Sequence, residues 1–151
     1  MLDNYGIPLR CGELTKKNPK HPKVKLEESV RRHLYLILIT RFGEYRCDPT
    51  YGCQLWEHDF ENLKALDDKK HTFENSIKTL LARHEPRLTE TLVSIDIKEP
   101  DIKDPLKLTQ KLRKRIEIKI RGRLVETNQP FEPKPFVIYF SPVATDSANL
   151  Q

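Results

Sequence analysis

The sequence predicts a single α+β domain in two layers, with two main helices packed on a small antiparallel sheet of three strands. Three observations lead to this prediction. Apolar residues recur at helical spacing in two segments of the first half of the chain. From residue 89 onward they recur at every second position, which is typical of half-buried strands. No helix-length insert separates the last two strand segments, which favours an antiparallel arrangement.

The first 25 residues predict an extended basic arm. Pro8, Pro19 and Pro22 stand close together, and proline blocks both helices and central strands. The arm carries six Lys or Arg and two Asp or Glu. We place the folded domain at residues 26–142 and a polar tail at residues 143–151.

The first main helix is predicted to begin at Leu26. Its apolar stripe consists of Leu26, Val30, Leu34, Ile37 and Leu38, with Arg41 at the next position of the same spacing. Tyr35, Leu36 and Ile39 widen the apolar face, so we expect the second half of this helix to be buried nearly all round. Gly43 is a natural stop for it.

A second helix and three strands follow. The helical stripe is Phe73, Ile77, Leu80, Leu81 and His84, and the helix is expected to end before Pro86. The strand positions predicted to share one face are Thr89, Thr91, Val93, Ile95 and Ile97, then Ile116, Ile118 and Ile120. Residues 98–111 form a long connection. Phe136 to Phe140 lie between two prolines, which is typical of an edge strand.

Composition excludes several classes of protein. The longest apolar run has six residues, Leu34 to Ile39, far short of the roughly 18 that would span a bilayer. The first residues lack the pattern of an export signal. We therefore expect a cytoplasmic protein with no direct membrane insertion. The net charge of +5 is uneven, with basic stretches at 1–25 and 98–123. This pattern suits either a surface that meets partner proteins or an ordinary solvated one.

No metal or cofactor is expected. Cys47 and Cys53 have Asp48 and His58 nearby but no second ligand pair downstream, and Cys11 lies in the arm. No glycine-rich phosphate loop is present. The basic residues 111–123 lack interleaved aromatics for stacking on bases, so we expect no nucleic-acid binding.

One enzymatic alternative stays open. A glycosidase needs two carboxyl groups at a defined separation, and one stretch of 18 residues holds five acids: Glu44, Asp48, Glu57, Asp59 and Glu61. Solvated loop acids explain this cluster more simply, because a working pair also needs an apolar pocket around one of them.

Two short segments stand out from the periodic pattern. Residues 41–56 pack glycines and aromatics into one non-periodic loop. At residues 84–88, Glu85 and Arg87 flank Pro86 at a helix-to-strand corner, where the proline restricts the backbone. From the residues alone, this corner is either a simple salt bridge or a docking point.

These segments, in this order, resemble the contractile-tail baseplate wedge family, also labelled lysozyme-like, which includes the type VI secretion protein TssE. The resemblance covers roughly residues 26–140 and rests on three motifs in combination. They are Arg41, Gly43, Glu44 and Arg46 of an R-x-G-E-x-R loop, the pair Tyr51 and Gly52, and the triplet Glu85, Pro86 and Arg87.

The resemblance implies a structural role without catalysis. Family members sit in a baseplate wedge with TssF- and TssG-like proteins, and the Glu-Pro-Arg triplet binds those partners. They also start polymerisation of the sheath, made of TssB- and TssC-like subunits, by exchanging strands with it. We expect Arg41, Gly43, Glu44, Arg46, Tyr51 and Gly52 to shape the loop or contact partners. The strand Phe136, Val137, Ile138, Tyr139 and Phe140 is the predicted sheath contact. A peptidoglycan hydrolase is the alternative, and a small regulatory adaptor a third.

Overall fold

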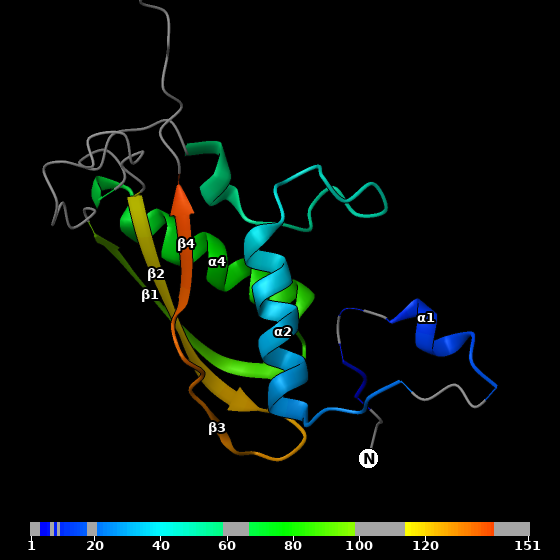
Figure 1. Ribbon diagram of the computed structural model, residues 1–151. Coiled ribbons are helices and arrows are strands. Elements are labelled where there is room, and N and C mark those ends of the chain that lie inside the picture. The colour runs from blue at the N-terminus through cyan, green and yellow to red at the C-terminus, as the bar shows by residue number, and fades with distance from the viewer. Residues whose placement is uncertain are drawn as a thin grey trace, which may run out of the picture.

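The computed structural model describes residues 4–6, 8, 10–17, 21–58, 67–98 and 114–140. Within these ranges, three α-helices and one 3-10 helix precede the sheet. The helices are α1 (Cys11–Leu14), α2 (Leu26–Ile39), η1 (Gln54–His58) and α4 (Lys70–His84). The strands are β1 (Leu88–Lys98), β2 (Lys114–Leu124), β3 (Pro130–Phe131) and β4 (Phe136–Phe140). Figure 1 shows this order along the chain.

The sheet is antiparallel, with β2 at its centre. β1 pairs with one edge of β2. β4 pairs with the first half of the other edge of β2, and the short β3 pairs with the end of that same edge. Ile118 of β2 lies opposite Ile95 on one side and Phe136 on the other. The predicted α+β class with its antiparallel three-strand sheet is thereby confirmed, and β3 adds a two-residue fourth strand.

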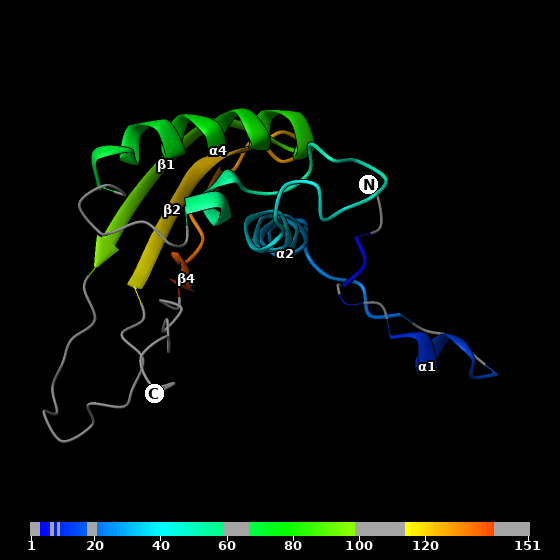
Figure 2. The ribbon, with the colours of Figure 1, turned by 90° about the horizontal axis from the view of Figure 1, so that it is seen from above.

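The core lies between one face of the sheet and the helices. Ile95, Ile116 and Ile118 are fully buried on the inner face. The helices contribute the stripes predicted for them, namely Val30, Leu34, Ile37 and Leu38 from α2 and Phe73, Ile77, Leu80 and Leu81 from α4. In Figure 2, α4 lies across β1 and β2, and α2 is seen nearly along its axis. The opposite face of the sheet carries charged pairs such as Lys98 with Glu117.

The burial of α2 differs from the prediction. Tyr35 is 49% exposed, and Leu36 and Ile39 are each 38% exposed. The expectation that the second half of α2 would be buried nearly all round is therefore wrong. The sheet and α4 cover one stripe of this helix, and the rest of its apolar surface faces outward.

A β-bulge interrupts the predicted alternation at the start of β1. The register with β2 shifts between Thr89 and Leu92, and Glu90 has a φ of 51°. One extra residue on β1 reverses the faces of the residues before it. Thr89 is exposed, although the alternation placed it on the inner face. Gly122 lies across from the bulge, where a Cβ would come within 2.8 Å of the Thr89 carbonyl oxygen.

The arm is not simply extended. Residues 11–14 form the one-turn helix α1, which the prolines nearby did not predict. Residues 4–6 lie beside residues 22–24: the Gly6 N–H donates to Pro22 O at 3.0 Å, and the Val24 N–H donates to Asn4 O at 2.8 Å. The chain thus doubles back before α2 begins, and the start of the arm is held against the domain. The predicted connection at 98–111 (apart from Lys98) and the tail at 143–151 lie outside the described residues.

Candidate functional site

The corner between α4 and β1 is held by backbone hydrogen bonds on both sides of Pro86. The Glu85 N–H donates to Leu81 O at 2.8 Å and closes the last turn of α4. The Leu88 N–H donates to Glu85 O at 3.1 Å, and the Arg87 carbonyl accepts from the Val125 N–H at 2.9 Å. Because proline cannot continue the helix, the chain turns here into β1. Pro86 itself is exposed at the tip of the turn.

A buried carboxylate organises this corner. Glu85 is only 1% exposed. Arg87 Nε donates to Oε1 at 2.7 Å, and Arg87 Nη2 donates to Oε2 at 2.6 Å, so the two groups meet in a bidentate pair. His33 Nδ1 lies 2.8 Å from Oε2. A carboxylate can only accept hydrogen bonds, so His33 must donate from Nδ1. The contact joins α2 to the end of α4.

Arg87 also ties two further segments to the corner. Its Nη1 donates to Ser29 Oγ at 3.0 Å in the first turns of α2, and to Asn4 Oδ1 at 3.4 Å in the arm. Arg87 therefore links β1, α2 and the arm, and most of its donors are used within the chain. About a third of its side chain, 35%, reaches the surface.

The charge of Glu85 is stabilised inside the corner. Burial alone would raise the pKa of this carboxyl group. The hydrogen bonds from His33 and Arg87, together with their charges, outweigh burial and lower the pKa of Glu85 to about 2. The same pairing raises the pKa of Arg87. The pair is thus an internal ion pair, so the salt bridge that the residues alone allowed at this corner is formed.

The loop after α2 is closed by its own backbone. The Cys53 N–H donates to Thr40 O at 2.8 Å, and the Gly43 N–H donates to Pro49 O at 3.1 Å. Gly52 has a φ of 127°, and a Cβ there would lie 2.6 Å from the Arg41 carbonyl oxygen, so only glycine fits. Glu44 Oε2 accepts from the Arg41 N–H at 2.8 Å. These hydrogen bonds and the Gly52 conformation together fix the backbone of this part of the loop.

Aromatic rings connect the loop to the corner. The Tyr51 ring stacks on His33 at 6.0 Å between centroids and meets His84 edge-on at 5.3 Å. Tyr45 packs edge-on against Tyr51. Burial, and next the negative charge of Glu85, raise the pKa of Tyr51 to about 12. An open pocket of about 490 Å³ runs over these rings and the outer side of α2. Arg46, in the same loop, is exposed.

The three described acids among those proposed for a hydrolase, Glu44, Asp48 and Glu57, do not converge on such a pocket as a pair. Glu44 is engaged with the loop backbone, and Asp48 accepts from the Thr50 hydroxyl at 2.6 Å and from the Thr50 N–H at 2.9 Å. These bonds lower the pKa of Asp48, whereas a general acid needs a raised pKa. Glu57 is exposed on η1. Asp59 and Glu61 lie outside the described residues.

The cysteines do not belong to a metal-binding cluster within the described ranges. Within these ranges no group of three or more His, Cys, Asp and Glu side chains is placed to hold a metal ion. Cys11 and Cys47 are exposed, and Cys53 is buried where its backbone bridges Arg41. Burial raises the pKa of the Cys53 thiol to about 11, which keeps it protonated.

Sequence reasoning missed three residues of the corner: His33, Ser29 and Asn4. His33 follows Val30 by three positions and precedes Ile37 by four, so it borders the apolar stripe of α2. A histidine at that position is a usable signal for a buried polar contact. Nothing in the spacing of Asn4, 83 residues before Arg87, could have shown its contact.

Comparisons with known proteins assign the chain with this fold to the tail baseplate class. The model of the family described as baseplate wedge protein gp25 matches residues 24–129. The chain belongs to this family. The predicted relation to the contractile-tail baseplate wedge proteins is thereby confirmed.

Individual relatives agree with the family match. The baseplate wedge protein gp25 of Enterobacteria phage T4 is 33% identical over 67 residues, which are 44% of this chain and 49% of the phage protein. The chain thus spans about half the length of that relative. A crystal structure from Geobacter sulfurreducens, described as that of a tail lysozyme, superposes with a TM-score of 0.52 at 24% identity. The superposition covers 80% of this chain and 96% of the other, and it supports the fold alone.

Among the described residues, no helix is long and apolar enough to cross a bilayer.

Proposed function

We propose that this protein is a TssE-like baseplate component of a type VI secretion apparatus, which docks on the wedge and starts assembly of the sheath. The partners would be TssF- and TssG-like wedge proteins and TssB- and TssC-like sheath subunits. The assembly would stand on the cytoplasmic side of the inner membrane. The family match supports the baseplate role. The observation that carries the sheath role is a difference between the two edges of the sheet.

The outer edge of β1 is blocked by α4. The Ile95 N–H points away from β2 and donates to Glu74 Oε1 at 3.0 Å. A strand that added to this edge would have to displace that carboxylate. β4 pairs with β2, and no described strand pairs with its second edge. Strand addition therefore favours β4.

The register identifies which β4 residues face outward. Opposed residues of an antiparallel pair exchange either two backbone hydrogen bonds or none, in alternation. Because Ile95 donates to Glu74, its pair with Ile118 exchanges none, and Ile118 turns its N–H toward β4. There Ile118 lies opposite Phe136, so Phe136 faces β2.

The same alternation continues along β4. Ile138 also faces β2, where it lies opposite Ile116. Val137 and Tyr139 direct their N–H groups outward, and the Tyr139 side chain is 54% exposed. A proline at Ile138 would remove a backbone hydrogen bond to β2. Such a variant could lose sheath recruitment simply because the sheet no longer folds. A proline at Tyr139 removes only an outward donor.

The test compares Tyr139→Pro with Tyr139→Ala. Both lose the side chain, but only the proline loses the backbone donor. We expect both variants to fold and to enter the wedge complex, and only Tyr139→Pro to lose sheath subunits in co-purification. Normal sheath recruitment by Tyr139→Pro would exclude β4 as the template. Loss in both variants would assign the contact to the tyrosine side chain.

The proposed wedge contact is the corner formed by Glu85, Pro86 and Arg87. Glu85 lies beneath Arg87, so the surface offered to a partner is Pro86 with the exposed third of Arg87. Glu85 then acts by positioning Arg87. Pro86→Ala should lower stability by no more than about 1 kcal/mol, because proline restricts the unfolded chain at this turn, and its folded fraction should lose wedge proteins in co-purification. A variant that still enters the wedge would reduce the triplet to a structural corner.

The proposal includes the absence of peptidoglycan hydrolysis. Purified protein should not clear peptidoglycan, because Glu44 and Asp48 accept hydrogen bonds within the loop and Glu57 is exposed on η1. Clearing activity that disappears in Glu44→Gln or Glu57→Gln would establish the hydrolase alternative instead.

A further inference from the structure

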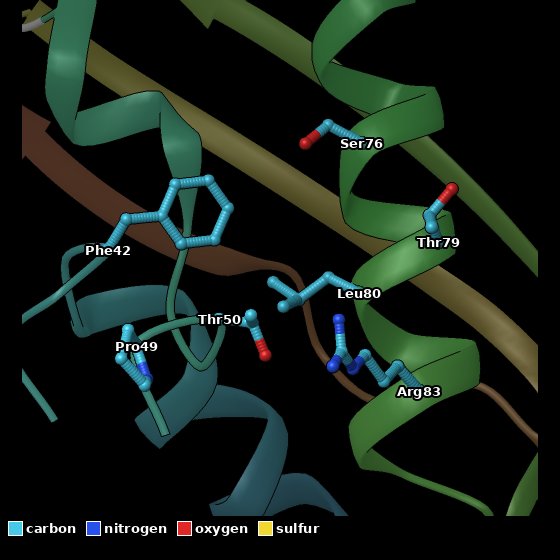
Figure 3. A pocket seen from close by; sticks show the side chains of 7 residues that line it. All are labelled: Phe42, Pro49, Thr50, Ser76, Thr79, Leu80 and Arg83. Carbon is cyan, nitrogen blue, oxygen red and sulfur yellow. The ribbon is translucent and has the colours of Figure 1, made fainter. Parts of the chain in front are cut away.

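A groove separates the loop after α2 from the flank of α4, on residues that the proposed sheath and wedge contacts do not use. It has a volume of about 550 Å³ and is lined by Phe42, Pro49, Thr50, Ser76, Thr79, Leu80 and Arg83. Figure 3 shows Phe42 and Leu80 directed toward the space between the two walls, with the Arg83 side chain entering from α4.

The loop wall of the groove is preorganised. The Gly43 N–H bonds to Pro49 O, which holds Phe42 and Pro49 on one side of the turn. The Thr50 N–H and hydroxyl are both bonded to Asp48. A ligand that enters would therefore order few new torsions in this wall, which favours binding.

The groove is apolar at its base and carries one cation. Leu80 is 7% exposed, and Phe42 is 38% exposed, so an apolar side chain placed between them would bury further surface. On the α4 wall, the Ser76 hydroxyl already donates to Gln54 Oε1, and the Thr79 hydroxyl donates to Asn75 O. These two hydroxyl protons are used internally, which leaves Arg83 as the strong polar group facing the space.

Arg83 has no ion-pair partner in the part of the chain that the structure describes. The neighbouring carboxylate, Asp48, is bonded to Thr50 and lies 3.8 Å from His84 Nδ1. The positive charge of Arg83 contributes only weakly to the lowered pKa of Asp48. An incoming carboxylate could therefore pair with Arg83 without displacing a partner among the described residues.

We propose that this groove binds a segment of a partner protein that inserts an aliphatic side chain between Phe42 and Leu80 and places an Asp or Glu carboxylate on Arg83. The carboxylate would complement Arg83, which is the cation that lines the groove. The surface is distinct from the β4 edge and from the Glu85 corner, so the proposal stands or falls independently of the sheath and wedge roles.

The probe is a pair of capped dipeptides, Ac-Leu-Glu-NH2 and Ac-Leu-Gln-NH2, titrated into the full chain and followed by amide shifts in NMR spectra. The two differ only in the carboxylate. We expect saturable shifts at Phe42, Leu80 and Arg83 with the acidic peptide, and binding about two- to fivefold weaker with the amide, as for a partly exposed ion pair.

Two variants isolate the cation. Arg83→Gln should weaken binding of the acidic peptide by about the same two- to fivefold and leave the amide peptide unchanged. Lys78→Gln removes an exposed cation of α4 that does not line the groove, and it should leave both affinities within twofold. Arg83 is itself exposed, so the variant should keep the fold, which a thermal melt verifies.

Three results would overturn the proposal. The first is the absence of saturable shifts in the groove with the acidic peptide. The second is equal binding of both peptides to wild type, or an acidic-peptide affinity that Arg83→Gln leaves unchanged. The third is preferential binding of Ac-Leu-OH, which would assign Arg83 to a chain-terminal carboxylate instead of a side chain.

Discussion

Glu85 and Arg87 are held together in a bidentate pair, with Nε to Oε1 at 2.7 Å and Nη2 to Oε2 at 2.6 Å, and the carboxylate is buried. Two residues apart in the chain, they face each other because Pro86 turns the backbone between them. The pair, together with His33, joins the end of α4 to α2 and to the start of β1. The corner is therefore part of the folded core as well as a surface feature.

Arg87→Ala should destabilise the protein by about 2–3 kcal/mol. The substitution leaves a buried carboxylate with His33 as its remaining side-chain hydrogen-bond partner, and a stranded charged acceptor costs more than the roughly 1–3 kcal/mol of a neutral one. Exposure of a third of Arg87 reduces the effect below that of a fully buried pair. Thermal melting should shift down by about 4–12 °C.

Arg83→Ala is the matched control, because Arg83 is an exposed arginine with no described ion pair. Its melting point should change by no more than about 2 °C, since such surface substitutions fall within about 0.5 kcal/mol. If Arg87→Ala melts like this control, the bidentate pair contributes nothing to folding.

The free energy of unfolding should fall as the pH drops from about 5 to 2, because Glu85 becomes protonated over this range. Its pKa is lowered in the folded state to about 2, from an ordinary value of 4.5. A carboxyl group with a depressed folded pKa stabilises the fold above its unfolded pKa, and that contribution is lost as the pH falls through the folded pKa. The loss should be about 2–4 kcal/mol at this one site.

Glu85→Gln supplies the comparison for this pH dependence. Urea unfolding at several pH values between 2 and 6 should show a large gap between wild type and variant at pH 6, which narrows toward pH 2. A gap that stays constant over this range would assign the acid sensitivity of the fold to other carboxylates.

Gly52→Ala should destabilise the loop after α2 by more than about 2 kcal/mol. The added methyl group would come within 2.6 Å of the Arg41 carbonyl oxygen, and the φ of 127° is unfavourable for any other residue. Gly43→Ala, with a φ of 74° and open space around it, should cost only about 1 kcal/mol. Gly12→Ala should be nearly neutral. Denaturant unfolding of the three variants checks this order, and equal effects at positions 52 and 12 would contradict it.

Much of the fold could be predicted because its pattern is local. Ile95, Ile116 and Ile118 alternate with polar residues, and alternation places them on one face wherever the strand pairs. The bulge at Glu90 depends on a backbone φ that no periodicity contains, so Thr89 was placed on the wrong face. Apolar composition also could not tell which side of α2 the chain itself covers, so the outward position of Leu36 was missed.

The candidate site could also be predicted only in part. Glu85 and Arg87 were identified because a proline between two charges predicts a tight corner. The partner of Glu85 in α2, His33, lies 52 residues before it and meets it only after α2 packs beside α4. Contacts of this kind depend on tertiary packing, and a single sequence gives at most the hint that a polar residue borders an apolar stripe.

Glu74→Ala should destabilise the fold by about 1–3 kcal/mol and expose a second edge of the sheet. Glu74 Oε1 accepts the hydrogen bond of the Ile95 N–H, and Ile95 is fully buried, so the alanine leaves a buried donor unsatisfied. Glu74→Gln keeps a carbonyl acceptor at nearly the same place and should retain most of the stability. Thermal melts give the first comparison. Light scattering at rising protein concentration compares the association of the two variants, because an open β1 edge should make only the alanine variant associate. If the two variants melt and scatter alike, the Glu74 contact neither satisfies Ile95 nor protects β1, and β1 becomes as eligible as β4 to receive a partner strand.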